Sequence, residues 1–389
     1  MPPGTGKRSR LLLERLLLSS VCPLPTFVFQ EHHTLPKGIL STIHYITINS
    51  RDLFTQLSLM AGDLILLTGG TGHVGHRTLI EALSKGYTVR AAVRSEAKAA
   101  EVRETKSIRP YLSQLTFITI PNIEVEGAFD EAVRGVDYIV HVASPLGKLS
   151  VDLDADVVQP AIRGTLSVLH SALKESSVKK VVITSSVVAV LPTEQRAFTE
   201  DNIEADPQGP YDNTWTAYIA SKKLAYNRTR DFIAHEKPSF DIVNIMPTFV
   251  IGKNEMATTR KAFDSGSNAL ALTPLLGKQN PTGTPIATCH VDDVAFVHIA
   301  SLSPKIKGYQ NFGVNYIPES PVQWDDAIDI VKKNFPEDVK KGIFPLGGSA
   351  KSIPLPFNAS KTEKTFGTKF KSFEDQIVDL AAYYAALEA

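Results

Sequence analysis

A glycine-rich turn between an apolar run and a helical pattern is the feature that most restricts the fold of this chain. The run Asp63-Leu64-Ile65-Leu66-Leu67-Thr68 is followed at once by Gly69-Gly70-Thr71-Gly72-His73-Val74-Gly75, and apolar residues then recur with helical spacing. Glycines let the chain turn sharply and let backbone N–H groups approach a pyrophosphate at the positive end of the next helix. This order of strand, turn and helix predicts a dinucleotide-binding α/β fold, although a lone glycine pattern also occurs in ordinary βα turns.

The same alternation of strands, turns and helices continues from Met60 to the end of the chain. We therefore expect a Rossmann-type doubly wound parallel sheet with a small C-terminal substrate-binding domain. The expected division is an N-terminal extension at 1–59, a nucleotide-binding domain with the catalytic residues at 60–251, and a substrate-binding part at 252–389. Within the last part, 252–285 is rich in Gly, Pro, Ser, Thr and Asn and is expected to be a loop or lid. Residues 286–301 are expected to pack back on the nucleotide-binding core.

Composition excludes several classes of function and leaves the first 59 residues open. Lys plus Arg and Asp plus Glu both number 41, so no net charge attracts nucleic acid. No apolar stretch approaches the ~20 residues of a membrane span. Two cysteines form neither a disulfide framework nor a metal pattern, which favours a reducing, cytoplasmic location and no metal.

Residues 1–59 resemble a mitochondrial presequence, but we favour a disordered extension or an upstream start codon ahead of Met60.

The end of the second predicted strand indicates which dinucleotide is bound. NAD-specific proteins usually place an acid about 20 residues beyond the glycines, to bind the ribose hydroxyls. Here Arg94 stands at that place, followed by Ser95 and Lys98 at the start of a helix. Two cations and a hydroxyl suit a 2′-phosphate, so NADP(H) is the expected cofactor. The alternative is that Arg94 and Lys98 only form the solvated face of a surface helix.

Tyr218 and Lys222 lie four residues apart in a helical stretch, 216–235, so both side chains project from one face. A phenol with a pKa of about 10 is a poor acid at neutral pH, and an adjacent ammonium lowers that pKa. Tyr218 is then expected to give its proton to a carbonyl oxygen as hydride reaches the carbon. Ser186, at the end of the strand predicted at 179–186, would hold that oxygen, and Lys222 would also bond the nicotinamide ribose.

Five further stretches carry the resemblance to one enzyme family. They are Val142-Ala143-Ser144-Pro145, Val181-Val182-Ile183-Thr184-Ser185-Ser186, Tyr218-x-x-Ser221-Lys222-Lys223, Met246-Pro247-Thr248-Phe249-Val250-Ile251-Gly252 and His290-Val291-Asp292-Asp293-Val294-Ala295. With Arg94-Ser95-x-x-Lys98, they resemble the extended short-chain dehydrogenases/reductases, in the branch of dihydroflavonol, cinnamoyl-CoA, and fungal methylglyoxal and aldehyde (ketone) reductases. The fungal aldehyde reductases resemble the chain most, because Val187-Val188-Ala189-Val190 replaces the Ala-Gly-Thr run of the plant enzymes.

This resemblance implies the functional residues. It makes Ser186, Tyr218 and Lys222 catalytic, and it makes Asn122 the counterpart of an acid that meets adenine, since an amide oxygen can still accept that bond. Tyr211, Trp215 and Phe249 are candidate pocket aromatics, with simple packing an equal alternative. The implied cofactor site consists of Gly69, Gly72, His73, Val74, Gly75, Arg94, Lys98, Asn122, Ile123, Ala143, Tyr218, Lys222, Pro247 and Val250.

The expected function is NADPH-dependent reduction of a small-molecule carbonyl substrate by a monomer or homodimer. One alternative is an epimerase, dehydratase or hydroxysteroid dehydrogenase, which share the Tyr-Lys pair, although those that retain NAD usually have an acid in place of Arg94. The other is a non-catalytic NADP(H) sensor that kept the fold and lost the chemistry. Such sensors tend to lose the tyrosine, and this chain keeps all three catalytic groups.

Overall fold

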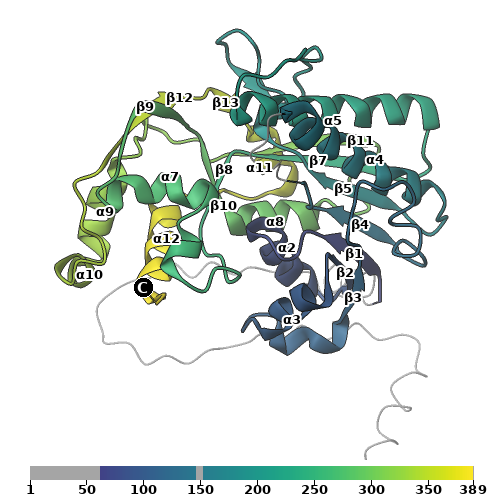
Figure 1. The fold of residues 1–389 in the computed structure, drawn as a ribbon, viewed down its shortest axis with the longest axis horizontal. Coiled ribbons are helices and arrows are strands. Elements are labelled where there is room, and N and C mark those ends of the chain that lie inside the picture. Colours follow the sequence, from purple (N-terminus) through teal and green to yellow (C-terminus); the bar gives the residue numbers. More distant parts are fainter. Residues whose placement is uncertain (1–61, 146–151, 389) are drawn as a thin grey trace, which may run out of the picture. The chain divides into compact units, whose positions relative to one another are not determined.

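A seven-stranded parallel sheet organises the computed structural model, which describes residues 62–145 and 152–388 (Figure 1). The strand order is β11-β7-β5-β4-β1-β2-β3, so the predicted doubly wound α/β fold is confirmed. The expectations for residues 1–59 concern residues outside the described part. The strands of the sheet are β1 (Leu64–Thr68), β2 (Thr88–Val93), β3 (Leu115–Thr119), β4 (Tyr138–His141), β5 (Lys180–Thr184), β7 (Asp241–Pro247) and β11 (Tyr309–Val314).

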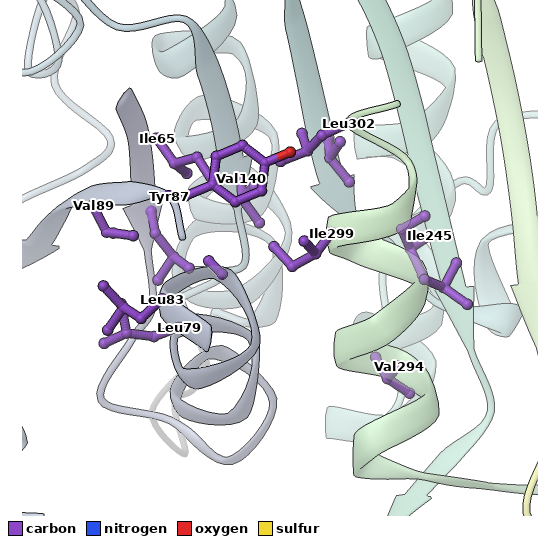
Figure 2. Close-up of a cluster of buried hydrophobic side chains, with 14 of the residues drawn as sticks. Ile65, Leu79, Leu83, Tyr87, Val89, Val140, Ile245, Val294, Ile299 and Leu302 are labelled. Carbon is purple, nitrogen blue, oxygen red and sulfur yellow. The ribbon is translucent and has the colours of Figure 1, made fainter. Parts of the chain in front are cut away.

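Helices cover both faces of this sheet, which is why its strands read as continuous apolar runs. On one face, α2 (His73–Ser84) and α8 (Val291–Ala300) lie side by side, and Figure 2 shows Leu79, Leu83, Val294 and Ile299 turned toward the strands. On the other face, α4 (Gln159–Leu173) and α5 (Thr214–Glu236) bury a second apolar cluster. Each fully buried Leu or Ile contributes about 1.5–3 kcal/mol, so the strand ends that carry the site rest on a rigid support.

Shorter elements connect these layers. They are α3 (Glu96–Glu104), η2 (Arg109–Gln114), η3 (Asp154–Val158), η4 (Val187–Ala189) and β6 (Phe198–Thr199). The C-terminal elements have their own buried cluster around Trp324, Phe344 and Leu272. Its members and neighbours are β8 (Phe249–Ile251), α6 (Arg260–Phe263), α7 (Gly266–Leu275), β9 (Gln279–Ile286), β10 (Thr288–His290), α9 (Asp326–Asn334), α10 (Pro336–Lys340), β12 (Ser349–Pro354) and α12 (Phe373–Ala386). Two further elements pack elsewhere, β13 (Phe357–Asn358) beside β6 and α11 (Ser360–Phe366) beside β11 and α8.

The segment 252–285 differs from the loop or lid that the sequence indicated. It contains α6, α7 and most of β9. Helix α7 shows no helical periodicity because its own residues are apolar or small on every side. It also begins at Gly266 and has Pro274 in its last turn, and neither residue is typical of a helix interior. Ala271, Leu272 and Leu275 are fully buried, so this segment forms part of the C-terminal core.

None of the helices in the described part of the chain is both long and apolar enough to cross a membrane.

Candidate active site

The glycine turn between β1 and α2 contains two glycines that the fold itself requires. Gly69 has a φ of +78°, and a Cβ there would lie 2.7 Å from the backbone nitrogen of Ala143. A Cβ on Gly75 would lie 2.1 Å from the carbonyl oxygen of Gly69. Gly72 is different: it is the N-cap of α2 with extended backbone, and its Cβ would meet only the Gly69 oxygen, at 3.5 Å. Gly72 therefore leaves open space at the positive end of a helix, where an anion would bind.

A groove of about 480 Å³ runs from this turn along the carboxyl ends of the parallel strands. In open α/β sheets, ligands bind at this edge. Of the cofactor-binding residues expected from the sequence, those that line the groove are Gly69, Gly72, His73, Val74, Gly75, Arg94, Lys98, Ile123, Ala143, Tyr218, Lys222, Pro247 and Val250. Ser186 lines it as well.

Other lining residues were missed by the sequence reasoning. Most of them end a strand of the sheet or follow one directly, and the predicted strand boundaries could have found them: Thr68, Ala92, Val93, Ile120, Val142, Thr184 and Ser185. Ser144 and Thr248 also line the groove, in two stretches that the sequence had already placed beside the cofactor. Ser267, in the first turn of α7, had no such signal because α7 was not predicted.

The structure does not place Asn122 in the groove. Its side chain is exposed, and its Oδ1 accepts a hydrogen bond from the Glu124 backbone nitrogen at 2.9 Å. This local Asx turn uses one of the two lone pairs of the amide oxygen that was expected to accept from adenine. The neighbouring Ile123 does line the groove. Asn122 itself does not line the groove, so its contact with adenine stays a prediction.

Arg94 and Lys98 both reach the groove, but their charges are balanced differently. Lys98 Nζ lies 2.6 Å from Glu101 Oε2, one helical turn further along α3. Arg94 directly follows β2 and is exposed, and within residues 62–145 and 152–388 no ion pair involves it. The side chain of Ser95 caps α3 by accepting from the Lys98 backbone nitrogen. Arg94 is thus the cation best able to attract an anionic group into this end of the groove.

Ser186, Tyr218 and Lys222 converge from two elements at the other end. Ser186 is buried just beyond β5, and its hydroxyl accepts from the Val188 backbone nitrogen. Tyr218 and Lys222 project from the same face of α5, with Lys222 Nζ 5.9 Å from the centre of the Tyr218 ring. Lys222 Nζ also donates to Ser144 Oγ at 3.2 Å. The three side chains come together as the sequence predicted.

The electrostatics of this cluster differ from the expectation. Burial raises the pKa of Tyr218, and the interaction that lowers it in part is a hydrogen bond with Ser186. Burial also lowers the pKa of Lys222 to about 8. In the protein alone, burial outweighs the interactions that lower the pKa of Tyr218, and the Lys222 ammonium donates to Ser144.

A second cavity, of about 530 Å³, opens on the other side of Ser186 and Tyr218. Trp215 and Phe249 line it, as the sequence suggested, but Tyr211 does not and packs against a cluster under α5 instead. The ring of Trp215 stacks on that of Tyr218, with centroids 5.7 Å apart and an interplanar angle of 22°. The remaining lining residues were not predicted: Val187, Val188, Leu191, Thr214, Thr248, Gly266, Ser267, Leu270, Pro285 and Leu355. We call this cavity the apolar pocket.

His290, which ends β10, has a structural place in the fold. Its Nδ1 accepts from the Asp292 backbone nitrogen at 3.1 Å and so caps α8. Its Nε2 lies 3.2 Å from Asp379 Oδ2 on α12. Asp292 bonds Arg77 and Lys371, and these interactions offset the burial that would raise the pKa of this carboxyl, holding it at about 2.

Comparisons with known proteins agree with this geometry. The NAD dependent epimerase/dehydratase family model matches residues 65–311. The ketoreductase CTB6 of Cercospora nicotianae is 38% identical over 346 residues, covering 84% of this chain and 96% of its own. The NAD-dependent epimerase/dehydratase ALT6 of Alternaria alternata is 34% identical over 340 residues, covering 81% and 95%. Gre2 of Candida albicans, crystallised with NADPH, shares the fold with a TM-score of 0.71 and 24% identity, covering 83% and 98%.

Proposed function

The chain belongs to the NAD-dependent epimerase/dehydratase family of extended short-chain dehydrogenases/reductases and is an oxidoreductase, and from this premise we propose that it reduces a small aldehyde or ketone with NADPH. The observation that carries the proposal is the boundary between the groove and the apolar pocket. Ser186 and Tyr218 line both cavities. A proton donor at this boundary can reach a carbonyl in the pocket while the cofactor lies in the groove.

The groove offers suitable partners for each part of NADPH. The open space at Gly72 and the backbone N–H groups of α2 suit the pyrophosphate. Arg94 has no acidic partner among the described residues, so it suits a cofactor with a 2′-phosphate better than one with a bare 2′-hydroxyl. Pro247 and Val250 are the expected contacts of the carboxamide. When bound, NADPH supplies the hydride.

The residues of the chain supply the proton and the alignment. Ser186 holds the carbonyl oxygen, and Tyr218 gives that oxygen its proton from the phenol hydroxyl. Lys222 holds the ribose hydroxyls and keeps a positive charge beside the ring, which stabilises the negative charge left on Tyr218. We also propose the division of labour expected from the sequence, with nucleotide binding and catalysis in 60–251 and substrate binding mainly in 252–389.

The alternatives are less well supported by the groove. An epimerase or dehydratase that retains NAD would gain from an acid after β2, where Arg94 stands. A non-catalytic sensor would not need Ser186, Tyr218 and Lys222 at one point. The ketoreductase name of the Cercospora relative also favours carbonyl reduction.

The test is a panel of aldehydes and ketones, with NADPH consumption followed by absorbance and NADPH binding followed by fluorescence. We expect turnover of at least one carbonyl and a rate that falls in Ser186→Ala. Tight NADPH binding without turnover of any carbonyl would contradict the proposal and favour the sensor. Binding of NADH in preference to NADPH would favour the epimerase or dehydratase.

A further inference from the structure

The walls of the apolar pocket restrict the chemistry of what it can bind. None of the described residues that line it carries a charge. Its polar side chains carry uncharged hydroxyl groups or the indole N–H of Trp215, and the hydroxyl of Thr248 already bonds the Val314 carbonyl and Asn315 Oδ1, both at 3.2 Å. A carboxylate or phosphate moved from water into such a pocket would lose its hydration without gaining an ionic partner. The pocket therefore selects against anionic substrates.

The size of the pocket argues against very small substrates. Its volume of about 530 Å³ lies within the ~300–1,000 Å³ typical of sites for drug-sized ligands. Aliphatic side chains from separate segments, including Val188, Leu191, Leu270 and Leu355, form its walls. A three-carbon aldehyde would leave most of these walls without contacts, whereas a multi-ring compound would cover them.

Trp215 adds a preference for flat rings. It lies one helical turn before Tyr218, and one face of its indole is stacked on the Tyr218 ring. Nevertheless 47% of Trp215 is exposed, which makes it one of the most exposed large apolar side chains among the described residues. An indole held rigid by stacking and left half open beside an apolar cavity is suited to pack against an aromatic ring.

We propose that the substrate is a neutral ketone that carries a fused aromatic ring system, bound with its rings against Trp215 and the aliphatic walls of the apolar pocket. The inference rests on the proposed function, which places the carbonyl at Ser186 and Tyr218. The rings extend away from that point, so their size and charge affect binding without changing the proton transfer.

The first experiment compares four carbonyl compounds with NADPH: 1-tetralone, the saturated 1-decalone, 1-tetralone-6-carboxylate, and methylglyoxal. We expect 1-tetralone to have the highest kcat/KM. The carboxylate should be at least about 100-fold poorer, because its charge is desolvated without a partner. The saturated ketone should have a KM about three- to tenfold higher, the usual effect of losing an aromatic contact, whereas its kcat also reflects the loss of conjugation at the carbonyl. Equal efficiency for the carboxylate, or a preference for methylglyoxal, would overturn the inference.

The second experiment uses the fact that the chain has only two tryptophans. Trp324 is fully buried in the C-terminal core, so quenching of the exposed Trp215 reports ligand at the pocket. We expect 1-tetralone to quench this fluorescence in the presence of NADP⁺, where no reduction occurs. Trp215→Ala should abolish the quenching and raise the KM for 1-tetralone about three- to tenfold, more than it lowers kcat. Trp215→Tyr should restore most of the KM.

Ile203→Ala is the matched control, because Ile203 is also a large apolar side chain, is 57% exposed, and lines neither cavity. Ile203→Ala should leave both the quenching and the KM unchanged.

The proposed reductase activity and the inference about the pocket would be contradicted by different results. Quenching by 1-tetralone without any turnover would contradict the reductase and keep the inference about the pocket. Turnover of carbonyls with no quenching and no effect of Trp215→Ala would contradict the inference and keep the reductase.

Discussion

The groove and the apolar pocket meet at Ser186 and Tyr218, yet the protein builds them in different ways. The groove follows the carboxyl ends of parallel strands, and many of its lining residues belong to the glycine turn or lie at the end of a strand. The pocket is assembled from side chains of segments far apart in sequence, from Val187 to Leu355. The topology of the sheet therefore provides the groove, whereas individual side chains determine the shape and polarity of the pocket. Changes in the groove should affect cofactor and chemistry, and changes in the pocket should affect substrate choice.

The largest expected effect concerns the residue that both regions share. Tyr218→Phe keeps the ring and its stacking on Trp215 but removes the proton donor, so turnover should fall by roughly 10²- to 10⁴-fold. NADPH affinity, measured by fluorescence titration, should be retained. Tyr211→Phe is the matched control, since Tyr211 lines neither cavity, and it should be as active as the unmodified protein. Normal turnover in Tyr218→Phe would refute the assigned role.

A smaller effect is expected at the far end of the groove. Arg94→Ala should lower kcat/KM with NADPH by about ten- to a hundredfold and leave NADH nearly unchanged, because charge-assisted bonds to a phosphate contribute roughly 1.5–3 kcal/mol. Arg109 is an exposed arginine outside the groove that pairs with Glu104, so Arg109→Ala serves as the control. If the unmodified protein used both cofactors equally well, Arg94 would not be a phosphate ligand.

Substitutions at Gly75 and Gly72 distinguish a glycine that the fold requires from one that cofactor binding requires. Gly75→Ala places a methyl against the Gly69 carbonyl and should lower the free energy of unfolding by about 1–3 kcal/mol. Gly72→Ala has room for its methyl in the protein alone, so its unfolding free energy should change by less than about 0.5 kcal/mol. Its NADPH affinity should nevertheless drop. Denaturant unfolding and NADPH titration measure both variants, and unaltered NADPH affinity in Gly72→Ala would show that the pyrophosphate lies elsewhere.

The pH dependence gives the smallest effect near neutral pH. Lys222 has a pKa lowered to about 8 by burial, so its ammonium is charged below that pH and neutral above it. The kcat/KM for NADPH, which reports groups of the free enzyme, should be flat near pH 7 and fall about tenfold for each pH unit above 8. His73 and His141, with pKa values of about 4 and about 3, should add no change near neutral pH. The fall should be absent in Lys222→Met, and its persistence there would assign it to another group.

The contrast between the two regions also explains what the sequence could predict. The strand, turn and helix pattern predicted the sheet and the glycine turn, and it placed Ser186 at a strand end beside them, because parallel strand ends meet at one edge. Helical spacing placed Tyr218 and Lys222 on one face of α5, and the family resemblance linked that face to Ser186. The local turn that the Asn122 amide forms was not predicted, because such a turn depends on backbone geometry rather than on residue type.

Most residues of the apolar pocket could not be predicted from the sequence, because they come from separate segments and no local pattern shows that these segments lie close together. Leu270 belongs to α7, a helix with no polar face and therefore no detectable period. Leu355 lies 169 residues after Ser186 in the chain, as the two residue numbers show, yet lines the same cavity. Trp215 and Phe249 could be named only because they flank the motifs of the groove.

The central claim is that groove and pocket contribute separately to one reaction, and a double-mutant cycle tests it most directly. Arg94 lines only the groove and Trp215 only the pocket, so the losses of kcat/KM in Arg94→Ala and Trp215→Ala should multiply in the double variant, within about twofold. Tyr218→Phe and Ser186→Ala act at one point, and their combination should cost far less than the product of the single losses. The measurement is kcat/KM for 1-tetralone with NADPH in all of these variants. A double variant of Arg94 and Trp215 that departs from the product by more than about fivefold would contradict the account.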